Sequence, residues 1–291
     1  MRLCSMIAII SGNNMSESLN VKDMKLYAQA NSIVADLVAM GFTEESEIDL
    51  EALCKIDQLH YHGVVSVQQA IDSMNIADCD KILEIGAGWG GPSRYIAAQT
   101  GAQLTALELQ RDFNNVGESL TQRCGLSSLV SHQVGDFLTA EFEVSKFSHI
   151  VSWLALYHIP DRAFYTNKIY GLLQPGGTVY VEDLMQGTAY KNTDPAVLSK
   201  ELFANSLVDE SAYLDSLRAV GFEITSAKNM TSDWAAFTVD RLQTFLQNRA
   251  GFIEVHGAAL FEEKKHFYTK IVDYFSTSSI AGLRVAARKP G

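Results

Sequence analysis

The sequence predicts an α/β fold built on a parallel, doubly wound β-sheet. Short apolar segments alternate with helical segments between residues 81 and 182, which is the pattern of parallel strands joined by crossover helices. The first of these apolar segments leads directly into a glycine-rich turn at residues 86–91. The chain has 291 residues, of which 47% are hydrophobic and 20% charged, so it is able to bury the core that such a sheet requires.

Five short apolar segments account for the central strands. A helix through Ala98 follows the glycine-rich turn, and a helix from Asp161 to Leu173 followed by a turn at residues 174–177 precedes the last strand. In chain order the predicted strands are Lys81–Ile85, Gln103–Leu107, Leu129–Val134, His149–Trp153 and Thr178–Glu182.

Helical segments are predicted on either side of these strands. Before them, apolar residues recur at helical spacing between Val21 and Met40, and another amphipathic stretch follows Gly63. After them, the pattern predicts helices near Ser211–Val220, Val239–Arg249 and Glu262–Phe275, a strand through Ile224 and a final strand at Ile280–Ala287.

These patterns divide the chain into two parts. Residues 1–63 are interpreted as an N-terminal tail and helical cap, and residues 64–291 as the main domain. Insertions near residues 185–210 and 230–278 of the main domain are expected to form the acceptor site. Ligands of parallel sheets bind at the carboxyl ends of the strands, so we expect these insertions to form a helical lid there.

The overall charge and the cysteines exclude several partners and sites. The formal net charge is −11 and no run of Lys or Arg is present, which argues against a nucleic-acid partner. No secretory signal is recognisable, and no apolar segment reaches the roughly 20 residues of a membrane span. Four cysteines without a CxxC pair indicate reduced thiols in a cytoplasmic protein: Cys4, Cys54, Cys79 and Cys124.

The glycine-rich turn is the main indication of a bound ligand. Glycine permits a tight turn between strand and helix and lets a ligand approach the backbone closely. Gly86, Gly88 and Gly91 also satisfy the GxGxxG pattern of dinucleotide-binding proteins. The turn alone therefore leaves a nicotinamide cofactor open.

Acidic residues at the ends of successive strands distinguish a nicotinamide cofactor from one that carries an amino group and a sulfonium. Glu84 lies two residues before the turn, where a carboxylate suits an amino group and a sulfonium and opposes a pyrophosphate. Glu108 is able to accept hydrogen bonds from both hydroxyls of a ribose, and Asp136 is placed to accept one from an adenine amino group. A nicotinamide enzyme would need only Glu108, so the three acids together favour S-adenosyl-L-methionine.

Residues 81–184 resemble the class I methyltransferases that use S-adenosylmethionine. The run Gly-Gly-Pro-Ser-Arg-Tyr at residues 90–95 is similar to the small-molecule branch that contains sarcosine/dimethylglycine, phosphoethanolamine and tocopherol methyltransferases. The Leu-Gln-Pro-Gly-Gly turn at residues 173–177 also matches. The resemblance implies a Rossmann-like, mostly parallel seven-stranded sheet whose last strand, Ile280–Ala287, is antiparallel.

The resemblance also implies a set of cofactor-binding residues. Gly86, Gly88, Glu108, Asp136 and Phe137 are expected to line the cofactor. The complete predicted cofactor site consists of Glu84, Gly86, Gly88, Gly90, Glu108, Leu109, Gln110, Asp136, Phe137 and Trp153.

His158 is the predicted catalytic base. It follows the fourth strand, whose carboxyl end faces the methyl group of the cofactor in this fold, and histidine is the side chain best suited to proton transfer near neutral pH. In phosphobase methyltransferases a similarly placed His acts with a Tyr from the N-terminal region, and Tyr61 is the corresponding candidate here. His62, Tyr157 and Trp234 are the candidate contacts to the acceptor.

No metal is predicted. His60 and His62 would face the same side of an extended strand, but no further ligand with suitable spacing follows them. The resemblance instead implies that this segment covers the methionine end of the cofactor.

Two departures from the phosphoethanolamine enzymes bear on the substrate. Those enzymes carry an Arg after the fourth-strand Ser where this chain has Trp153, and the basic residues expected around a phosphate are not evident between Leu184 and Tyr213. The predicted function is therefore methylation of a small metabolite at an amine nitrogen, as in sarcosine or dimethylglycine. Methylation of a thioether, phenol or quinol at sulfur, oxygen or carbon is the alternative.

Two hypotheses that assign the protein to other functional classes also remain. One is a cofactor-binding partner subunit that has lost catalysis, which the intact acids and His158 argue against. The other is a nicotinamide oxidoreductase. The sequence gives no indication of the oligomeric state.

Overall fold

A computed structural model describes residues 30–291. The predicted tail and the first part of the helix expected from Val21 lie outside the described residues. The remainder of that helix is α1 (Ser32–Ala39).

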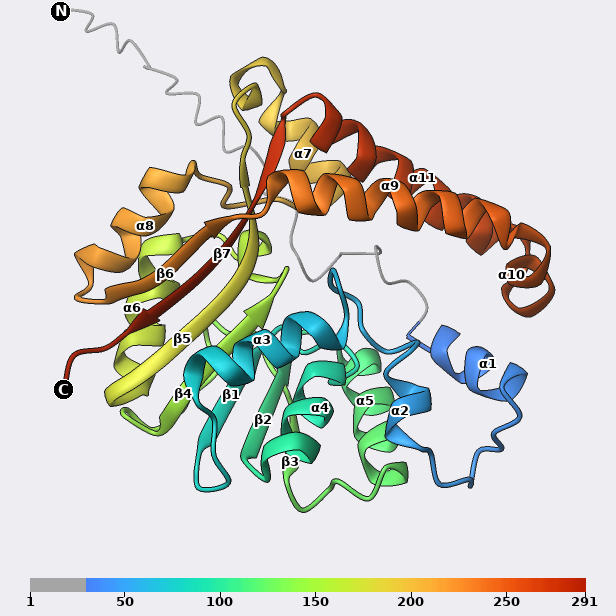
Figure 1. Ribbon diagram of the computed structural model, residues 1–291, viewed down its shortest axis with the longest axis horizontal. Coiled ribbons are helices and arrows are strands. Elements are labelled where there is room, and N and C mark those ends of the chain that lie inside the picture. The colour runs from blue at the N-terminus through green and yellow to red at the C-terminus, as the bar shows by residue number, and fades with distance from the viewer. Residues whose placement is uncertain (1–29) are drawn as a thin grey trace, which may run out of the picture.

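The chain forms one seven-stranded sheet with the strand order β3-β2-β1-β4-β5-β7-β6 (Figure 1). Neighbouring strands pair in parallel from β3 to β5, and β7 is antiparallel to both β5 and β6. This arrangement confirms the predicted fold class. The strands are β1 (Lys81–Ile85), β2 (Gln103–Glu108), β3 (Val130–Val134), β4 (Phe147–Trp153), β5 (Leu173–Gln186), β6 (Glu223–Asn229) and β7 (Ile280–Arg288).

Helices cover both faces of the sheet, which explains why its central strands are apolar at nearly every position. Ile82 packs with α3 and α4, whereas the next residue, Leu83, packs with α6 and α8 on the opposite face. In Figure 1, α3, α4 and α5 lie in front of the strands, and α6 and α8 lie behind. The helices are α3 (Val64–Met74), α4 (Gly91–Thr100), α5 (Arg111–Arg123), α6 (Arg162–Leu172) and α8 (Glu210–Ala219).

Two further parts lie outside the sheet and the helices that cover it. Residues 30–63, here called the cap, contain α1 and α2 (Leu50–Leu53). Residues 231–276, here called the arm, contain α9 (Thr231–Gln247), α10 (Arg249–His256) and α11 (Ala258–Ser276) and extend to the right above the cap in Figure 1. The predicted domain boundary at residue 63 remains a prediction.

Two hydrogen-bonded His–Asp pairs join the cap to the arm. His62 of the cap lies 2.7 Å from Asp233 at the start of α9. His256 at the end of α10 lies 2.7 Å from Asp36 of α1. The two contacts bring together segments that are 171 and 220 residues apart in the sequence.

The predicted elements differ from the structure mainly after β4. Strand β5 begins at Leu173, because Leu173 already pairs with Phe147 of β4, and the predicted turn at residues 174–177 forms an irregularity before Thr178 pairs with His149. Helix α9 begins eight residues before the predicted Val239, where polar Ser232 and Asp233 hide an amphipathic start. Helices α2, α10 and α7 (Pro195–Leu202) were not predicted.

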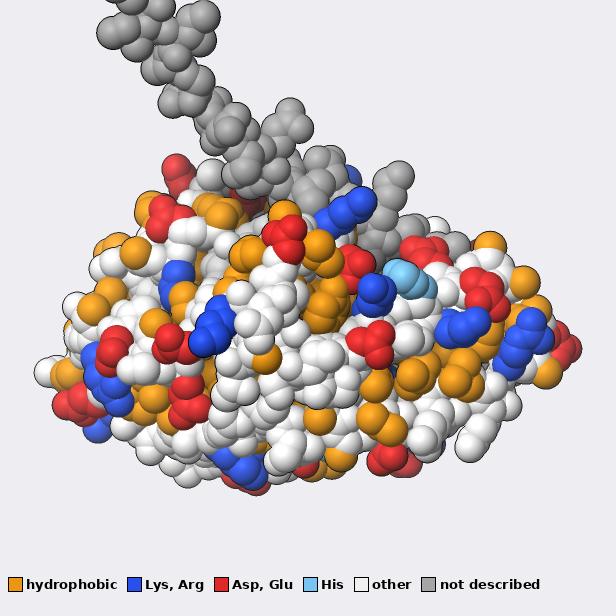
Figure 2. Space-filling view, turned by 90° about the horizontal axis from the view of Figure 1, so that it is seen from above, with side chains coloured by type: hydrophobic (Ala, Val, Ile, Leu, Met, Phe, Trp, Pro, Cys, Tyr) orange, Lys and Arg blue, Asp and Glu red, His pale blue; other side chains and the backbone are white. Residues whose placement is uncertain are grey.

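No helix among residues 30–291 is long and apolar enough to cross a membrane. On the face shown in Figure 2, acidic and basic side chains are interspersed among apolar ones, and the described residues form no continuous basic patch there.

Candidate active site

The glycine-rich turn joins β1 to α4 in a conformation that side chains disfavour. Gly86, Gly88 and Gly90 have φ angles of 76°, 55° and 77°, in the left-handed region. A Cβ atom on Gly86 would collide with the Cβ atom of Ala155, which follows β4. Glycine at position 86 therefore allows the loops after β1 and β4 to lie against each other.

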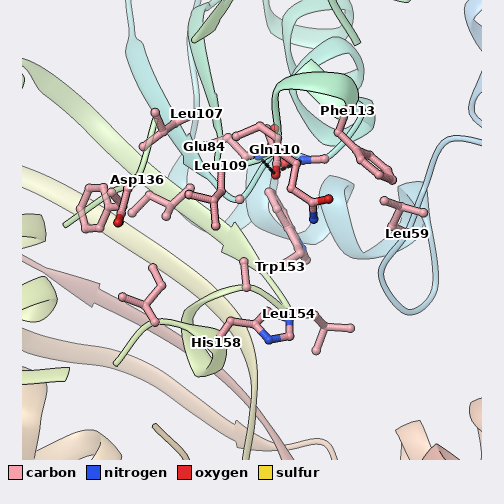
Figure 3. Close-up of a pocket in the computed structure, with 18 of the residues that line it drawn as sticks. Leu59, Glu84, Leu107, Leu109, Gln110, Phe113, Asp136, Trp153, Leu154 and His158 are labelled. Atoms are coloured by element: carbon pink, nitrogen blue, oxygen red, sulfur yellow. Dashed lines mark hydrogen bonds between the residues drawn. The ribbon is translucent and has the colours of Figure 1, made fainter. Parts of the chain in front are cut away.

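A cavity of about 420 Å³ opens at the carboxyl ends of β1, β2, β3 and β4 (Figure 3). Ten of the predicted site residues line this one cavity: Glu84, Gly86, Gly88, Glu108, Leu109, Gln110, Asp136, Phe137, Trp153 and His158. In the view of Figure 3, Glu84 and Gln110 lie on one side of the cavity and His158 on the other.

Glu84 is a buried carboxyl group at the end of β1. One of its oxygens accepts hydrogen bonds from the backbone N–H of Ser93, at 3.1 Å, and from the Ser93 hydroxyl. Burial raises the pKa of Glu84 to about 8, because the charged form loses its hydration. The side chain is therefore mainly protonated at neutral pH until a cation lies beside it.

The carboxylate of Glu108 is held by the backbone around it. Its two oxygens accept hydrogen bonds of 2.8 Å from the N–H groups of Gly88 and Gln110. Burial raises its pKa as well, against the effect of these hydrogen bonds. Asp136, after β3, accepts a hydrogen bond of 2.9 Å from the N–H of Leu138.

His158 lies in a 3₁₀ turn, η2 (Leu156–His158), that follows β4. Its Nδ1 lies 3.0 Å from the carbonyl oxygen of Phe203. A carbonyl only accepts hydrogen bonds, so Nδ1 carries the proton and Nε2 keeps a free lone pair. Burial lowers the pKa of His158 to about 4, which leaves the ring neutral at physiological pH.

The polar backbone groups of η2 are held from two sides. From β5, Asp183 accepts a hydrogen bond of 3.1 Å from the N–H of Tyr157. From the loop after α7, the Asn205 side-chain amide donates to the carbonyl of His158 at 2.9 Å, and its backbone N–H donates to the carbonyl of Tyr157 at 2.9 Å. These contacts fix the position of the imidazole ring.

Five predicted residues do not line the cavity. Gly90 lies at the start of α4, where an added Cβ atom would meet the ring of His132. Tyr157 lies next to His158, with 3.9 Å between the ring centres. His62 faces the arm through its contact with Asp233.

The other two, Tyr61 and Trp234, belong to the core between the cap and the arm. Their rings pack edge to face at 5.1 Å, and the guanidinium of Arg241 lies 5.0 Å above the Tyr61 ring. Trp234 is completely buried against Gly282 of β7. Neither aromatic ring reaches the cavity, so the structure does not place Tyr61 beside His158.

The sequence analysis expected the segment that contains Leu59 and His60 to cover the cofactor, but it missed several other cavity residues. Asp57, Leu59 and His60 of the cap cover the glycine-rich turn, and a buried ion pair of 2.9 Å between Asp57 and Arg94 fixes this segment. Arg94 belongs to the run at residues 90–95 noted above, but its partner was not recognisable at a separation of 37 residues. The other missed residues are Ile85, Ala87, Pro92, Leu107, Phe113, Gly135, Leu138, Leu154, Ala155, Ile159, Pro160 and Asn205.

The two histidines of the cap have separate contacts. The Nε2 atom of His60 lies 3.1 Å from the carbonyl of Gly63, and His62 is bonded to Asp233. No group of three or more His, Cys, Asp or Glu side chains suited to a metal occurs among residues 30–291.

The cavity suits a cationic cofactor with ribose hydroxyls and an amino group. Its polar groups include the acids at the ends of β1, β2 and β3 and backbone groups of the glycine-rich turn, together with the side chains of Asp57, His60, Gln110, His158 and Asn205. None of the described residues that line it is Lys or Arg, so a pyrophosphate would find no cationic side chain.

Comparison with known proteins agrees with this chemistry. The curated relatives include phosphoethanolamine N-methyltransferase 1 of Zea mays, which is 25% identical over 191 residues, 66% of this chain and 38% of that protein. They also include a glycine/sarcosine/dimethylglycine N-methyltransferase of Actinopolyspora halophila, 26% identical over 192 residues, 65% of this chain and 34% of that protein. The chain thus spans less than two fifths of the length of these relatives.

Solved structures share the fold. Phosphoethanolamine N-methyltransferase 2 of Haemonchus contortus, in complex with phosphomonomethylethanolamine and S-adenosylhomocysteine, superposes with a TM-score of 0.73 at 20% identity, over 81% of this chain and 55% of that one. The family model described as mycolic acid cyclopropane synthetase matches residues 29–284. The chain belongs to this family, and its fold and cavity are those of the class I methyltransferases that use S-adenosylmethionine.

Proposed function

We propose that this protein transfers the methyl group of S-adenosylmethionine to an amine nitrogen of a small metabolite. The observation that carries the proposal is a single cavity in which three acids at successive strand ends face a neutral histidine. The N-methyltransferases among the relatives support the choice of nitrogen.

Each acid has a role in holding the cofactor. Glu84 would pair with its ammonium group, Glu108 would accept hydrogen bonds from the ribose hydroxyls, and Asp136 would accept one from the adenine amino group. Gly86 and Gly88 leave the backbone open to close approach. The bound cofactor supplies an electrophilic methyl group on a sulfonium.

His158 would orient the nucleophile. The free lone pair on Nε2 is able to accept a hydrogen bond from the N–H of an amine, which directs the nitrogen lone pair away from the ring. The walls around it include the apolar residues Leu154, Ala155, Ile159 and Pro160, which would limit competition from water once the cofactor and the amine are bound. Alignment of this kind is worth up to roughly 7–11 kcal/mol in related reactions.

Methyl transfer to oxygen, sulfur or carbon is the second candidate. The acceptor side of the cavity is formed by Leu154, Ala155, Ile159 and Pro160, which would also accommodate a thioether, a phenol or a quinol. The description of the family, a cyclopropane synthetase, likewise includes transfer to carbon.

Transfer of a labelled methyl group from S-adenosylmethionine to a panel of acceptors tests the proposal. The panel contains amines, thioethers and phenols, and cofactor binding is measured separately by calorimetry. We expect labelled N-methyl products. Cofactor binding without transfer to any amine, or labelled products only from the thioethers or phenols, would contradict the proposal.

A further inference from the structure

The loop that follows α7 bonds to the ring of His158 and to the backbone beside it. In this loop, residues 203–206, here called the clasp, lie against η2. The carbonyl oxygen of Phe203 lies 3.0 Å from Nδ1 of His158, and the side-chain amide of Asn205 donates to the carbonyl of His158 at 2.9 Å. The last two residues of the clasp donate their backbone N–H groups to the carbonyl of Tyr157, at 2.9 and 3.1 Å. Of these groups, the Phe203 carbonyl is the one that bonds to the ring itself.

Phe203 has a backbone conformation that its side chain disfavours. It ends α7 with a φ of 52° and a ψ of 35°, in the left-handed region, where helices usually end in glycine or asparagine. Its N–H still bonds to the carbonyl of Leu198 in α7, while the next residues turn back towards η2. Such a conformation persists where the contacts around it determine it. The left-handed turn thus belongs to the same arrangement that aims the Phe203 carbonyl at His158.

Helix α7, which carries the clasp, is attached to the arm. Leu202 packs in one core cluster with Ile271 and Tyr274 of α11. Glu201 accepts a hydrogen bond from the Tyr274 hydroxyl and lies 3.3 Å from the ammonium nitrogen of Lys270. Because α7 is fixed to α11 in this way, the clasp presents its carbonyl from a support that does not depend on η2.

We infer that Phe203 is a positioning residue, whose backbone carbonyl fixes the tautomer and the orientation of His158. The carbonyl only accepts hydrogen bonds, so it keeps the ring proton on Nδ1 and the lone pair on Nε2, where the nucleophile would need it. Without that carbonyl, the ring is free to take the other tautomer and to rotate. The inference rests on the proposed role of His158 and deepens it. It also means that position 203 requires a residue able to adopt a positive φ, rather than a phenylalanine side chain.

Nitrogen NMR of the imidazole rings tests the tautomer directly. In protein labelled at the histidine ring nitrogens and saturated with S-adenosylhomocysteine, the protonated and the unprotonated nitrogen of a neutral ring give separate signals. The chain has seven histidines, so comparison with the His158→Gln variant identifies the signals of His158. We expect one tautomer, with the proton on Nδ1. A proton on Nε2, or a mixture of both tautomers, in the unaltered protein would overturn the inference.

Variants of Phe203 that differ in backbone preference test its part in this arrangement. Phe203→Gly and Phe203→Asn introduce residues that adopt a positive φ, whereas Phe203→Val introduces a β-branched residue that opposes it. We expect the Gly and Asn variants to keep the Nδ1 tautomer and the Val variant to show both tautomers. Because Gly removes more of the side chain than Val does, lost packing alone predicts the opposite order. An unaltered spectrum in the Val variant, or an equal change in the Gly variant, would contradict the inference.

Turnover and a control variant separate positioning from stability. With the amine that is methylated fastest in the panel, we expect kcat to fall by about tenfold to a hundredfold in Phe203→Val and to stay within about threefold in Phe203→Gly, while the cofactor Kd changes by less than about twofold. Asn75→Val opposes the same left-handed conformation at the end of α3, outside the cavity, and should lower stability without changing the tautomer or kcat. An equal loss of kcat in both Val variants would overturn the inference.

The tautomer is observed without methyl transfer, so this test is independent of the proposed function. Absence of transfer to every amine would contradict the proposed function, and the NMR result would still decide whether the Phe203 carbonyl fixes His158. If Phe203→Val does not fold, the unaltered protein and the Gly and Asn variants decide it, since loss of the Nδ1 tautomer in any of these proteins overturns the inference.

Discussion

Glu84 and His158 are both kept uncharged by the same cause. Burial raises the pKa of the acid to about 8 and lowers the pKa of the base to about 4, because each charged form loses hydration. Only a bound ligand of opposite charge would favour the charged form of either side chain and so reverse its pKa shift. Glu84 and His158 therefore carry no charge before the cofactor enters, and the protonation of Glu84 is expected to change on binding.

Cofactor binding should release a proton from Glu84. At pH 7 the empty site holds this proton, since the pKa is raised to about 8, and a bound ammonium favours the carboxylate form. We therefore expect cofactor affinity to rise with pH between about 6 and 8, by up to about tenfold per pH unit, and to level off above that range. Calorimetry in buffers with different ionisation enthalpies measures the released proton.

Glu84→Gln is the matched variant for this prediction. It keeps the shape of the side chain but has no titratable proton, so the pH dependence should disappear and the affinity should fall by about tenfold to a hundredfold. A wild-type affinity that does not change with pH would contradict the assignment.

His158→Gln should affect turnover rather than cofactor binding. Loss of the Nε2 acceptor is expected to lower kcat by about 10²–10⁴-fold while the cofactor Kd stays within about twofold. Because the pKa of His158 is lowered to about 4, its protonation should not limit the wild-type rate above about pH 5. Unchanged kcat in the variant would remove His158 from the reaction.

The sequence predicted those site residues whose positions depend on residues close to them in the chain. Glu84, Glu108 and Asp136 follow directly from the ends of strands, and the parallel sheet brings those ends together. Tyr61 and Asn205 depend on contacts made by the arm and by the loop after α7, which no local pattern reveals. Tyr61 was chosen by resemblance to the Tyr of phosphobase methyltransferases and Trp234 as a candidate acceptor contact, but both rings lie in the core between cap and arm.

At the scale of elements, the loops after β1 and β4 depend on each other. Gly86→Ala should destabilise the protein by about 3 kcal/mol or more, because its Cβ atom would collide with that of Ala155 and its φ angle is positive. Adding Ala155→Gly removes the collision and should restore all but about 1–2 kcal/mol. Urea unfolding of both single variants and the double variant measures this recovery. Additive effects would contradict the contact.

Trp234 anchors α9 to the sheet. Trp234→Ala should cost about 3–5 kcal/mol of stability, because it empties a fully buried site between Gly282 and Tyr61. Trp234→Phe retains most of the packing and should leave the acceptor KM unchanged, as measured by steady-state kinetics. A large increase in KM with normal stability would instead show that Trp234 contacts the acceptor.

The order and type of the core elements were predictable, whereas the arm was only partly so. Alternation of apolar and helical segments defined β1 to β5, most clearly at β1 and β4, where both faces of the strand are buried. In the arm, α9 begins with polar residues, and α10 has no fully buried residue to mark its inner face. Pro195 opens α7 directly after the N-cap Asp194. This pattern is a recognisable helix start that the sequence analysis did not use.

On the scale of the whole molecule, the two His–Asp pairs join the arm to the cap, whose residues Asp57, Leu59 and His60 line the cavity. Asp36→Ala combined with Asp233→Ala breaks both contacts, and we expect the cofactor dissociation rate to rise several-fold with a change in stability below about 2 kcal/mol. Stopped-flow dissociation measures the rate. Asp215→Ala breaks an exposed pair with Arg218 outside this region and serves as the control. Equal rates in all three proteins would show that the contacts do not limit cofactor exchange.

The position of β7 has a consequence for how the protein forms during translation. This strand is made after all the others, yet it lies between β5 and β6, and the described pairing of β6 is with β7 alone. While the ribosome is still adding residues 280–288, β5 has an unpaired apolar edge and β6 has no neighbour. Nascent chains stalled before β7 should therefore expose a strand edge that chaperones recognise, whereas the glycine-rich half is already able to fold.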